Sequence, residues 1–146
     1  MKVFADASFL YNAYYPEQVF SSLAQRLWQR GDLRINASIA VILEFRIGAL
    51  WDAKNEDGWS QFQRDKESEK VKEVAVDWDK LFWDFEPAAL QYGKLAQPRL
   101  IDGLHVLAAR QTGATHFLSF DHRSRQRAFA RAVGLKVLPE RLPGEF

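Results

Sequence analysis

The sequence predicts an α/β protein, with a three-layer α/β/α sandwich around a central parallel sheet. Short β-rich runs alternate along the chain with segments of helical periodicity, which is typical of parallel strands joined by helices on both faces of a sheet. The chain has 146 residues, 47% of them hydrophobic and 27% charged, which suits one compact domain. Because the sequence contains no cysteine, a disulfide scaffold, a thiolate metal site and a cysteine nucleophile are excluded.

Five short runs are expected to form the strands, because each is rich in apolar or β-branched residues and is followed by a turn or capping residue. They are residues 2–5, 33–36, 71–76, 115–120 and 136–138.

The helices are expected between these runs, where apolar residues recur at intervals of three or four. Ser8, Pro16 and Ser38 stand where the first three helices are predicted to begin. Asp79 can cap a later helix that Pro87 breaks or kinks, and two more are predicted at residues 100–111 and 124–133. We expect the helix after Ser38 to bury an apolar stripe formed by Ile39, Leu43, Ile47 and Leu50.

The charge of the chain is unevenly distributed, although the net charge is only +1. Residues 51–90 contain 6 basic and 11 acidic side chains, whereas residues 99–146 contain 8 basic and 4 acidic ones. The last third is therefore a candidate surface for an anionic partner. The sequence has no apolar run long enough for a membrane span and no signal-peptide pattern, so we expect a cytoplasmic protein with no membrane association.

Four carboxylates stand at positions that favour a shared site. Asp6 and Asp121 each directly follow a predicted strand, and ligands of open parallel sheets bind beyond the carboxyl ends of strands. Glu44 lies in a helix that is apolar on nearly every side, where an unpaired carboxylate is costly. Asp102 lies in the first turn of a helix, three residues before His105.

Each acid also has a purely structural interpretation. Asp6 and Asp121 can cap the helices that follow them, and Asp102 can interact with a helix dipole. Glu44 can form a salt bridge with Arg46 or Arg26.

Four segments in order resemble the motifs of PIN-domain nucleases, and specifically the VapC-like toxins of type II toxin–antitoxin systems. They are Phe4-Ala5-Asp6-Ala7-Ser8, the helix around Glu44, which is expected to be buried, Asp102-Gly103-Leu104-His105 and Phe117-Leu118-Ser119-Phe120-Asp121. The resemblance covers essentially the whole chain. It implies one PIN-like nuclease domain over residues 1–139, a tail over residues 140–146, and the strand order 3-2-1-4-5.

The resemblance further implies a metal-dependent endoribonuclease that hydrolyses RNA phosphodiester bonds with Mg²⁺ or Mn²⁺. Asp6, Asp102 and Asp121 would be direct or water-mediated metal ligands, and Glu44 would be a ligand or position the attacking water. Ser8 and Ser119 match small polar positions that orient the acids. His122-Arg123 stands where many relatives carry a further acid or asparagine, so the resemblance does not imply a fully formed second metal site. The implied partners are RNA, an antitoxin protein and a second copy of the chain.

An acidic site needs nearby positive charge to attract RNA, and the basic residues that follow Asp121 can supply it. We predict phosphate contacts for Arg123, Arg127 and Arg131, of which the last two share a helical face. A solvated helix face is the alternative for these residues.

Three other functions fit the sequence less well than a nuclease does. A PIN-fold protein that binds RNA without cutting it would not need the four acids. A phospho-acceptor domain would show an acid pair after the first strand, and a haloacid-dehalogenase-like phosphatase would carry an acid where Ser8 stands.

Overall fold

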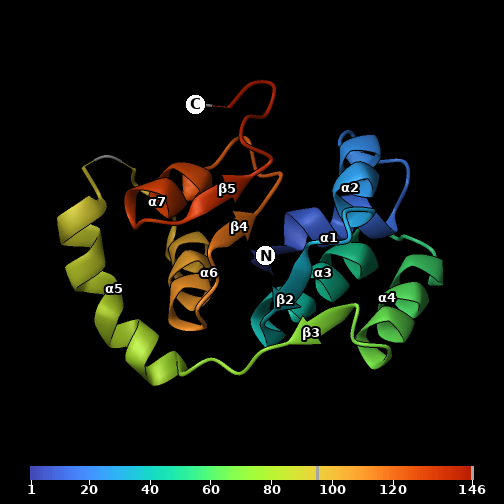
Figure 1. Ribbon diagram of the computed structural model, residues 1–146, viewed down its shortest axis with the longest axis horizontal. Coiled ribbons are helices and arrows are strands. Elements are labelled where there is room, and N and C mark those ends of the chain that lie inside the picture. Colours follow the sequence, from blue (N-terminus) through green and yellow to red (C-terminus); the bar gives the residue numbers. More distant parts are fainter. Residues whose placement is uncertain (95, 146) are drawn as a thin grey trace.

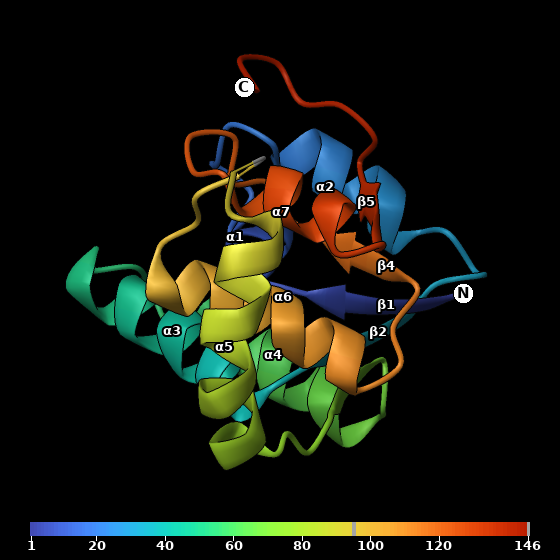
Figure 2. The ribbon, with the colours of Figure 1, turned by 90° about the vertical axis from the view of Figure 1, so that its left-hand side faces the viewer.

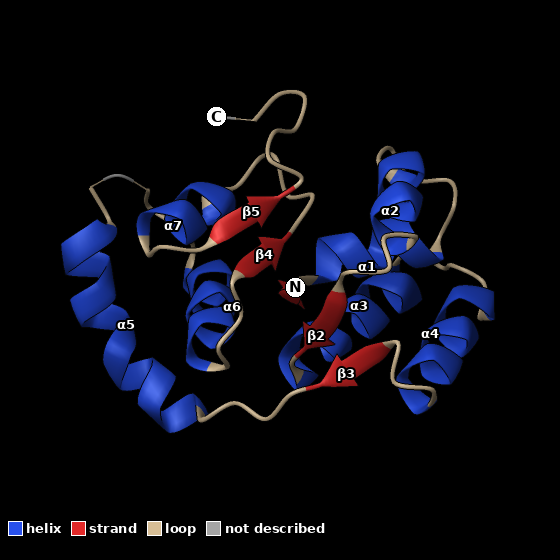
Figure 3. Ribbon diagram, viewed as in Figure 1, coloured by secondary structure: helices blue, strands red, loops and turns tan. Residues whose placement is uncertain are grey.

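The computed structural model describes residues 1–94 and 96–145, in which helices and strands alternate along the chain (Figures 1 and 3). In chain order, these elements are β1 (Lys2–Ala5), α1 (Ala7–Tyr14), α2 (Ser21–Trp28), β2 (Arg34–Ala37), α3 (Ile39–Trp51), α4 (Asp57–Glu67), β3 (Val71–Glu73), α5 (Trp78–Tyr92), α6 (Leu100–Gln111), β4 (His116–Leu118), α7 (Gln126–Ala132) and β5 (Lys136–Leu138).

The strands form one parallel sheet in the order β3-β2-β1-β4-β5, which confirms the predicted strand order and the predicted sandwich. Helix α1 contacts α2, α3 and α4, whereas α6 contacts α5 and α7. Figure 1 shows these two groups of helices on opposite sides of the sheet. Because every strand runs the same way, all carboxyl ends meet at one edge of the sheet, which we call the carboxyl edge, and all amino ends meet at the opposite amino edge.

The core lies on both faces of the central strands. Val3, Phe4 and Ala5 of β1 are fully buried, as are Phe117 and Leu118 of the neighbouring strand β4. This burial on both faces explains why β1 appears as a continuous apolar run instead of an alternating one.

Three predicted helix starts differ from the observed ones. Asp6, not Ser8, caps α1, because the Asp6 carboxylate accepts the backbone N–H of Phe9. Pro16 begins a series of turns, and α2 starts only at Ser21. Helix α5 is capped by Asp77 and continues through Pro87, which therefore does not end it.

The predicted core stripe of α3 is wrong, whereas its cap at Ser38 is confirmed. Ile39, Leu43, Ile47 and Leu50 are 37–54% exposed, and the buried side of the helix instead carries Val41, Ile42, Phe45 and Ala49. The helix is apolar on nearly every side, so its sequence does not distinguish one face from another. The aromatic ring of Phe45, which packs against Tyr14 and Phe62, faces the core.

Residues 140–145 of the predicted tail lie against α7. Leu142 is buried, and the carboxylate of Glu145 forms ion pairs with Arg127 and Arg131. Phe146, which completes the predicted tail, lies outside the described residues.

Within the described residues, no helix combines the length and the apolar character that a membrane span requires.

Candidate active site

Four elements bring the candidate acids toward the carboxyl edge of the sheet. Asp6 follows β1 and Asp121 follows the end of β4, and these two strands are neighbours. Asp102 lies in the first turn of α6 and Glu44 in the second turn of α3. Figure 2 shows β1 pointing away from the N-terminus toward the side where α3 extends and α6 begins. The fold therefore gathers acids that are up to 115 positions apart in the sequence.

Asp6 is the most tightly held of the four acids. Its Oδ1 accepts hydrogen bonds from Ser8 Oγ at 2.6 Å and from the backbone N–H of Phe9 at 3.0 Å. Its Oδ2 accepts a hydrogen bond from Ser119 Oγ at 2.6 Å. The side chain is nearly buried, with 4% exposure. Both serines that were expected to support the acids thus donate to Asp6.

Burial raises the pKa of Asp6 to about 6 from its usual value of 3.8. The hydrogen bonds from Ser119, Ser8 and Phe9 oppose this rise because they stabilise the charged carboxylate, but the loss of solvation outweighs them. At neutral pH Asp6 is therefore an ionised carboxylate in a poorly solvated place, where a cation would stabilise it.

Asp102 and Asp121 face a cavity of about 450 Å³ at this edge. Burial raises the pKa of Asp102, and the negative charges of Asp121 and Glu44 raise it further. The acids are thus close enough to repel one another. The cavity is also lined by basic and polar side chains: Gln97, Arg99, Arg123, Ser124 and Arg125.

Asp121 also shapes the loop that follows β4. Its Oδ1 accepts the backbone N–H groups of Arg123 and Ser124, at 3.2 and 3.0 Å. Its own N–H donates to Ser119 Oγ at 3.1 Å, which links it to the serine that holds Asp6. Helix α7 begins only at Gln126, so Asp121 closes a turn and does not cap that helix.

Glu44 pairs with His105 and not with an arginine. Its Oε2 lies 2.6 Å from His105 Nε2, whereas Arg46 pairs with Glu56 instead. The Glu44 side chain is 46% exposed, so the expected burial of this acid is wrong, while His105 is only 3% exposed. Among the described residues, no partner is found for the buried His105 Nδ1. The spacing of Asp102 and His105 in the sequence did not indicate this contact, because it joins helices from opposite layers.

We predict that Glu44→Ala lowers the free energy of unfolding by about 1–3 kcal/mol in metal-free buffer, because it leaves both ring nitrogens of buried His105 without a protein partner. Glu44→Gln is the matched control, since its amide can still form a hydrogen bond with Nε2 and should cost less. Urea denaturation of the three proteins measures the difference. Equal stability of Glu44→Ala and the wild type would show that the contact with His105 contributes nothing.

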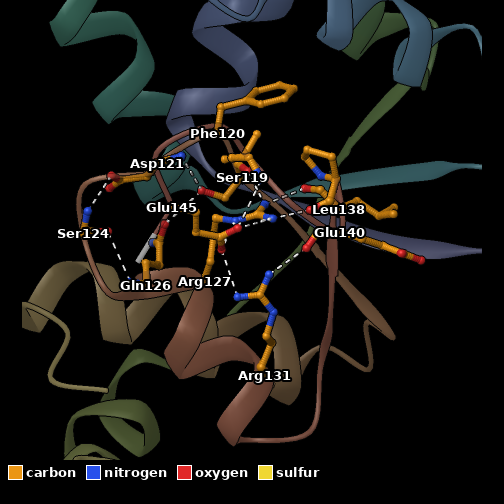
Figure 4. Close-up of polar contacts among 12 residues, drawn as sticks. Ser119, Phe120, Asp121, Ser124, Gln126, Arg127, Arg131, Leu138, Glu140 and Glu145 are labelled. Carbon is orange, nitrogen blue, oxygen red and sulfur yellow. Dashed lines mark hydrogen bonds and ion pairs between the residues drawn. The ribbon is translucent and has the colours of Figure 1, made fainter. Parts of the chain in front are cut away.

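The prediction that Arg127 contacts RNA is wrong for this fold. The Arg127 side chain is 1% exposed, and its guanidinium donates to the backbone carbonyls of Ser119, Leu138 and Pro139 and to Glu145 (Figure 4). The pattern of α7 could not show this burial, because the groups that surround Arg127 come from β4, β5 and the tail.

Arg131 and Arg123 remain at the surface. The Arg131 side chain is 39% exposed, but its guanidinium donates to the Glu145 carboxylate and to the carbonyl of Glu140 (Figure 4). Arg123 is exposed and lines the cavity beside Asp102 and Asp121, as do Arg99 and Arg125. Arg125 belongs to the basic run after Asp121 in which positive charge is predicted, whereas Arg99, which directly precedes α6, is distant from that run in the sequence and was not predicted.

The donor set suits a hard divalent cation in its chemistry, because it consists of carboxylate oxygens whose mutual repulsion a cation would relieve. Among residues 1–94 and 96–145, however, no three histidine, aspartate, glutamate or cysteine side chains lie close enough together to hold one ion. Glu44 is turned toward His105, and Asp121 accepts bonds from its own turn. This spacing fits ligands that reach an ion partly through water.

The fold resembles that of a solved toxin structure. Mycobacterium tuberculosis VapC20, described as a toxin that cleaves the sarcin–ricin loop, superposes with a TM-score of 0.67 at 17% sequence identity. The match covers 97% of this chain and 99% of that one. No family model matches the sequence, and no curated protein matches it. At this identity the likeness establishes the fold alone, a PIN-like α/β/α sandwich around a parallel five-stranded sheet.

Proposed function

We propose that this protein is a divalent-cation-dependent endoribonuclease and the toxin of a type II toxin–antitoxin pair. One observation carries the proposal: Asp102 and Asp121 line one cavity at the carboxyl edge, where burial and then the negative charges of Asp121 and Glu44 raise the pKa of Asp102. Carboxylates with perturbed pKa values are typical of functional sites, and a bound cation would relieve the repulsion between these acids. The shared fold with a toxin that cleaves RNA supports the same function.

Within this proposal, Asp6, Asp102 and Asp121 hold Mg²⁺ or Mn²⁺, either directly or through water. When bound, the cation acts as a Lewis acid toward the scissile phosphate and stabilises the leaving oxygen. Ser8 and Ser119 keep the Asp6 carboxylate in one orientation through their two short hydrogen bonds. Glu44 either joins the ligands or orients the attacking water, and His105 fixes its present position.

The arginines of the cavity draw the RNA to this acidic edge. Arg99, Arg123 and Arg125 line the same cavity as Asp102 and Asp121, so a phosphate that enters it meets both the acids and their counter-charges. Arg123 keeps the role predicted for it, while Arg99 and Arg125 replace the buried Arg127. Such charge complementarity raises the rate and strength of RNA binding at low salt.

We further propose an antitoxin protein and a second copy of this chain as partners. Large apolar side chains are exposed on three helices, among them Leu43 and Trp51 of α3, Trp83 and Leu90 of α5, and Ile101 of α6. Exposed apolar surface of this kind is typical of protein interfaces, and it supports such contacts.

Cleavage of a 5′-labelled RNA tests the function directly. We expect cleavage in Mg²⁺ or Mn²⁺, loss of activity by more than about a hundredfold in excess chelator, and recovery when the metal is returned. Binding of RNA without cleavage in either metal would instead favour the alternative, a PIN-fold RNA-binding protein. Cleavage that is unchanged by chelation would overturn the metal assignment.

A further inference from the structure

The amino edge of the sheet, opposite the candidate acids, is rich in basic residues. Four strands begin with one: Lys2 in β1, Arg34 in β2, His116 in β4 and Lys136 in β5. Lys70 directly precedes β3, and Lys72, the second residue of β3, lies opposite Asn36. The parallel register places Lys2 directly beside Arg34, and His116 directly beside Lys136. The same strand direction that gathers acids at the carboxyl edge therefore gathers basic groups here.

A cavity of about 1110 Å³ lies at this edge, and we call it the amino-edge groove. Its lining includes six positive groups, which are the N-terminal amine, Lys2, Arg30, Arg34, Lys70 and Lys72, and two acids, Asp32 and Glu69. The Asp32 carboxylate is already engaged by Arg30 at 2.8 Å. The groove is therefore strongly positive even though the whole chain is nearly neutral.

Most of this positive charge is not compensated by the protein. In the described part of the chain, Arg34, Lys70 and Lys72 form no ion pair, and all three are exposed. The pKa of His116 reflects this positive charge: burial lowers it most, and Lys136, Arg30 and the N-terminal amine lower it further.

We propose that the amino-edge groove binds the phosphate backbone of an RNA strand, as a second contact remote from the candidate active site. The identity of the ligand rests on the proposed function, since RNA is the polyanion on which the carboxyl edge would act. Lys2 and Arg34 lie directly beside each other on neighbouring strands, and Lys72 on the next strand is offset from Arg34 by two residues. Because these strands are spaced about 4.8 Å apart, the three residues form a cluster of positive charge that suits a ligand with repeated negative charge. Trp28 lines the groove and is half-buried.

The Trp28 ring in the lining of the groove favours RNA over an acidic polypeptide. The Trp28 ring is held in place by packing against Phe9 and Tyr14, with centroid distances of 6.2 and 5.6 Å. Single-stranded nucleic acids carry a base beside every phosphate, and each base can stack on such a ring, whereas an acidic polypeptide has no ring at its aspartate and glutamate positions. The two edges are separated by strands of three or four residues, or about 13 Å, so a long RNA can reach both edges.

The test compares two variants with double charge reversals. The groove variant combines Arg34→Glu and Lys72→Glu, and the matched control combines Lys80→Glu and Arg110→Glu on the opposite helical layer. Affinity for a long single-stranded RNA is measured at several salt concentrations in chelator, so that no cleavage is needed. We expect weaker binding by the groove variant alone, with the log–log salt slope reduced by about 1.4 for two lost phosphate contacts. Thermal melting checks that both variants are folded.

A dinucleotide substrate separates this proposal from the proposed function. It carries only one phosphodiester bond, so we expect the groove variant to cleave it at the wild-type rate in Mg²⁺ while its affinity for long RNA falls. If no RNA is cleaved by any of the proteins, yet the groove variant still loses RNA affinity, the nuclease assignment fails and the second contact stands. Equal salt slopes for the groove variant and the control would overturn the second contact. Unchanged RNA binding together with lost binding of polyglutamate would assign the groove to an acidic protein instead.

Discussion

Replacing Asp6 by asparagine is expected to reduce RNA cleavage by at least about a thousandfold while the protein stays folded. Asparagine has nearly the same size and keeps an oxygen that can accept from Ser8 and from the N–H of Phe9, so the cap of α1 survives. The new amide can donate to Ser119 Oγ, which then donates to Gln126 Oε1, already 3.2 Å away. The substitution therefore removes the negative charge and leaves the surrounding contacts satisfied.

The same variant should be more stable than the wild type in metal-free buffer at neutral pH. The pKa of Asp6 is raised from 3.8 to about 6, so the ionised carboxylate destabilises the folded protein above pH 6, by at most about 3 kcal/mol. As the pH falls from about 6 to about 4, the folded wild type takes up this proton before the unfolded chain does, and the penalty disappears. The stability difference between the two proteins should therefore shrink over this range, as measured by urea denaturation at several pH values.

Asp65→Asn is the matched control for both measurements. Asp65 is likewise a buried aspartate, 5% exposed, but it accepts hydrogen bonds from Tyr14 and Gln61 and lies outside the site. Its replacement should leave the rate of RNA cleavage unchanged. Normal cleavage by Asp6→Asn in magnesium would remove Asp6 from the site.

Much of the fold could be predicted because it depends on local patterns. The strands at residues 2–5 and 136–138 and the helix at 100–111 have their predicted boundaries, and Ser38 caps α3. These elements have clear periodicity or a capping residue directly beside them. Strand–helix alternation then restricts the topology, because parallel strands need crossover helices.

What could not be predicted depends on contacts between distant segments. Which side of α3 is exposed depends on the packing of Phe45 against distant residues such as Phe62. The pairing of Glu44 with His105 joins two helices through residues that are 61 positions apart. Asp6 was selected from its place after a strand, but its three hydrogen bonds come partly from Ser119, which is 113 residues away. A charged residue such as Arg127 is expected at the surface, and only the assembled fold shows that backbone carbonyls surround it.

Arg127→Met should produce the largest loss of stability among the substitutions considered, about 3–5 kcal/mol in the free energy of unfolding. Methionine fills much of the same space, but it donates no hydrogen bond, so the carbonyls of Ser119, Leu138 and Pro139 lose their contacts with the guanidinium. The Glu145 carboxylate, which is only 11% exposed, also loses its closest partner at 2.7 Å. Because the lost bonds connect β4, β5 and the tail, the damage should spread to Ser119 and thus to Asp6.

Arg131→Met is the matched control, since it lies one turn further along α7 and binds the same Glu145. Its side chain is 39% exposed, so its ion pair is screened by water and its removal should cost less than about 1 kcal/mol. Burial raises the pKa of Glu145, but the bonds from Arg127 and Arg131 outweigh it and hold the pKa below its usual 4.5. The stabilisation from Glu145 should therefore be complete at neutral pH and be lost as the pH falls below about 4.5. Urea denaturation at pH 7 and pH 3 measures both effects, and equal losses for the two arginine variants at pH 7 would contradict a buried structural role for Arg127.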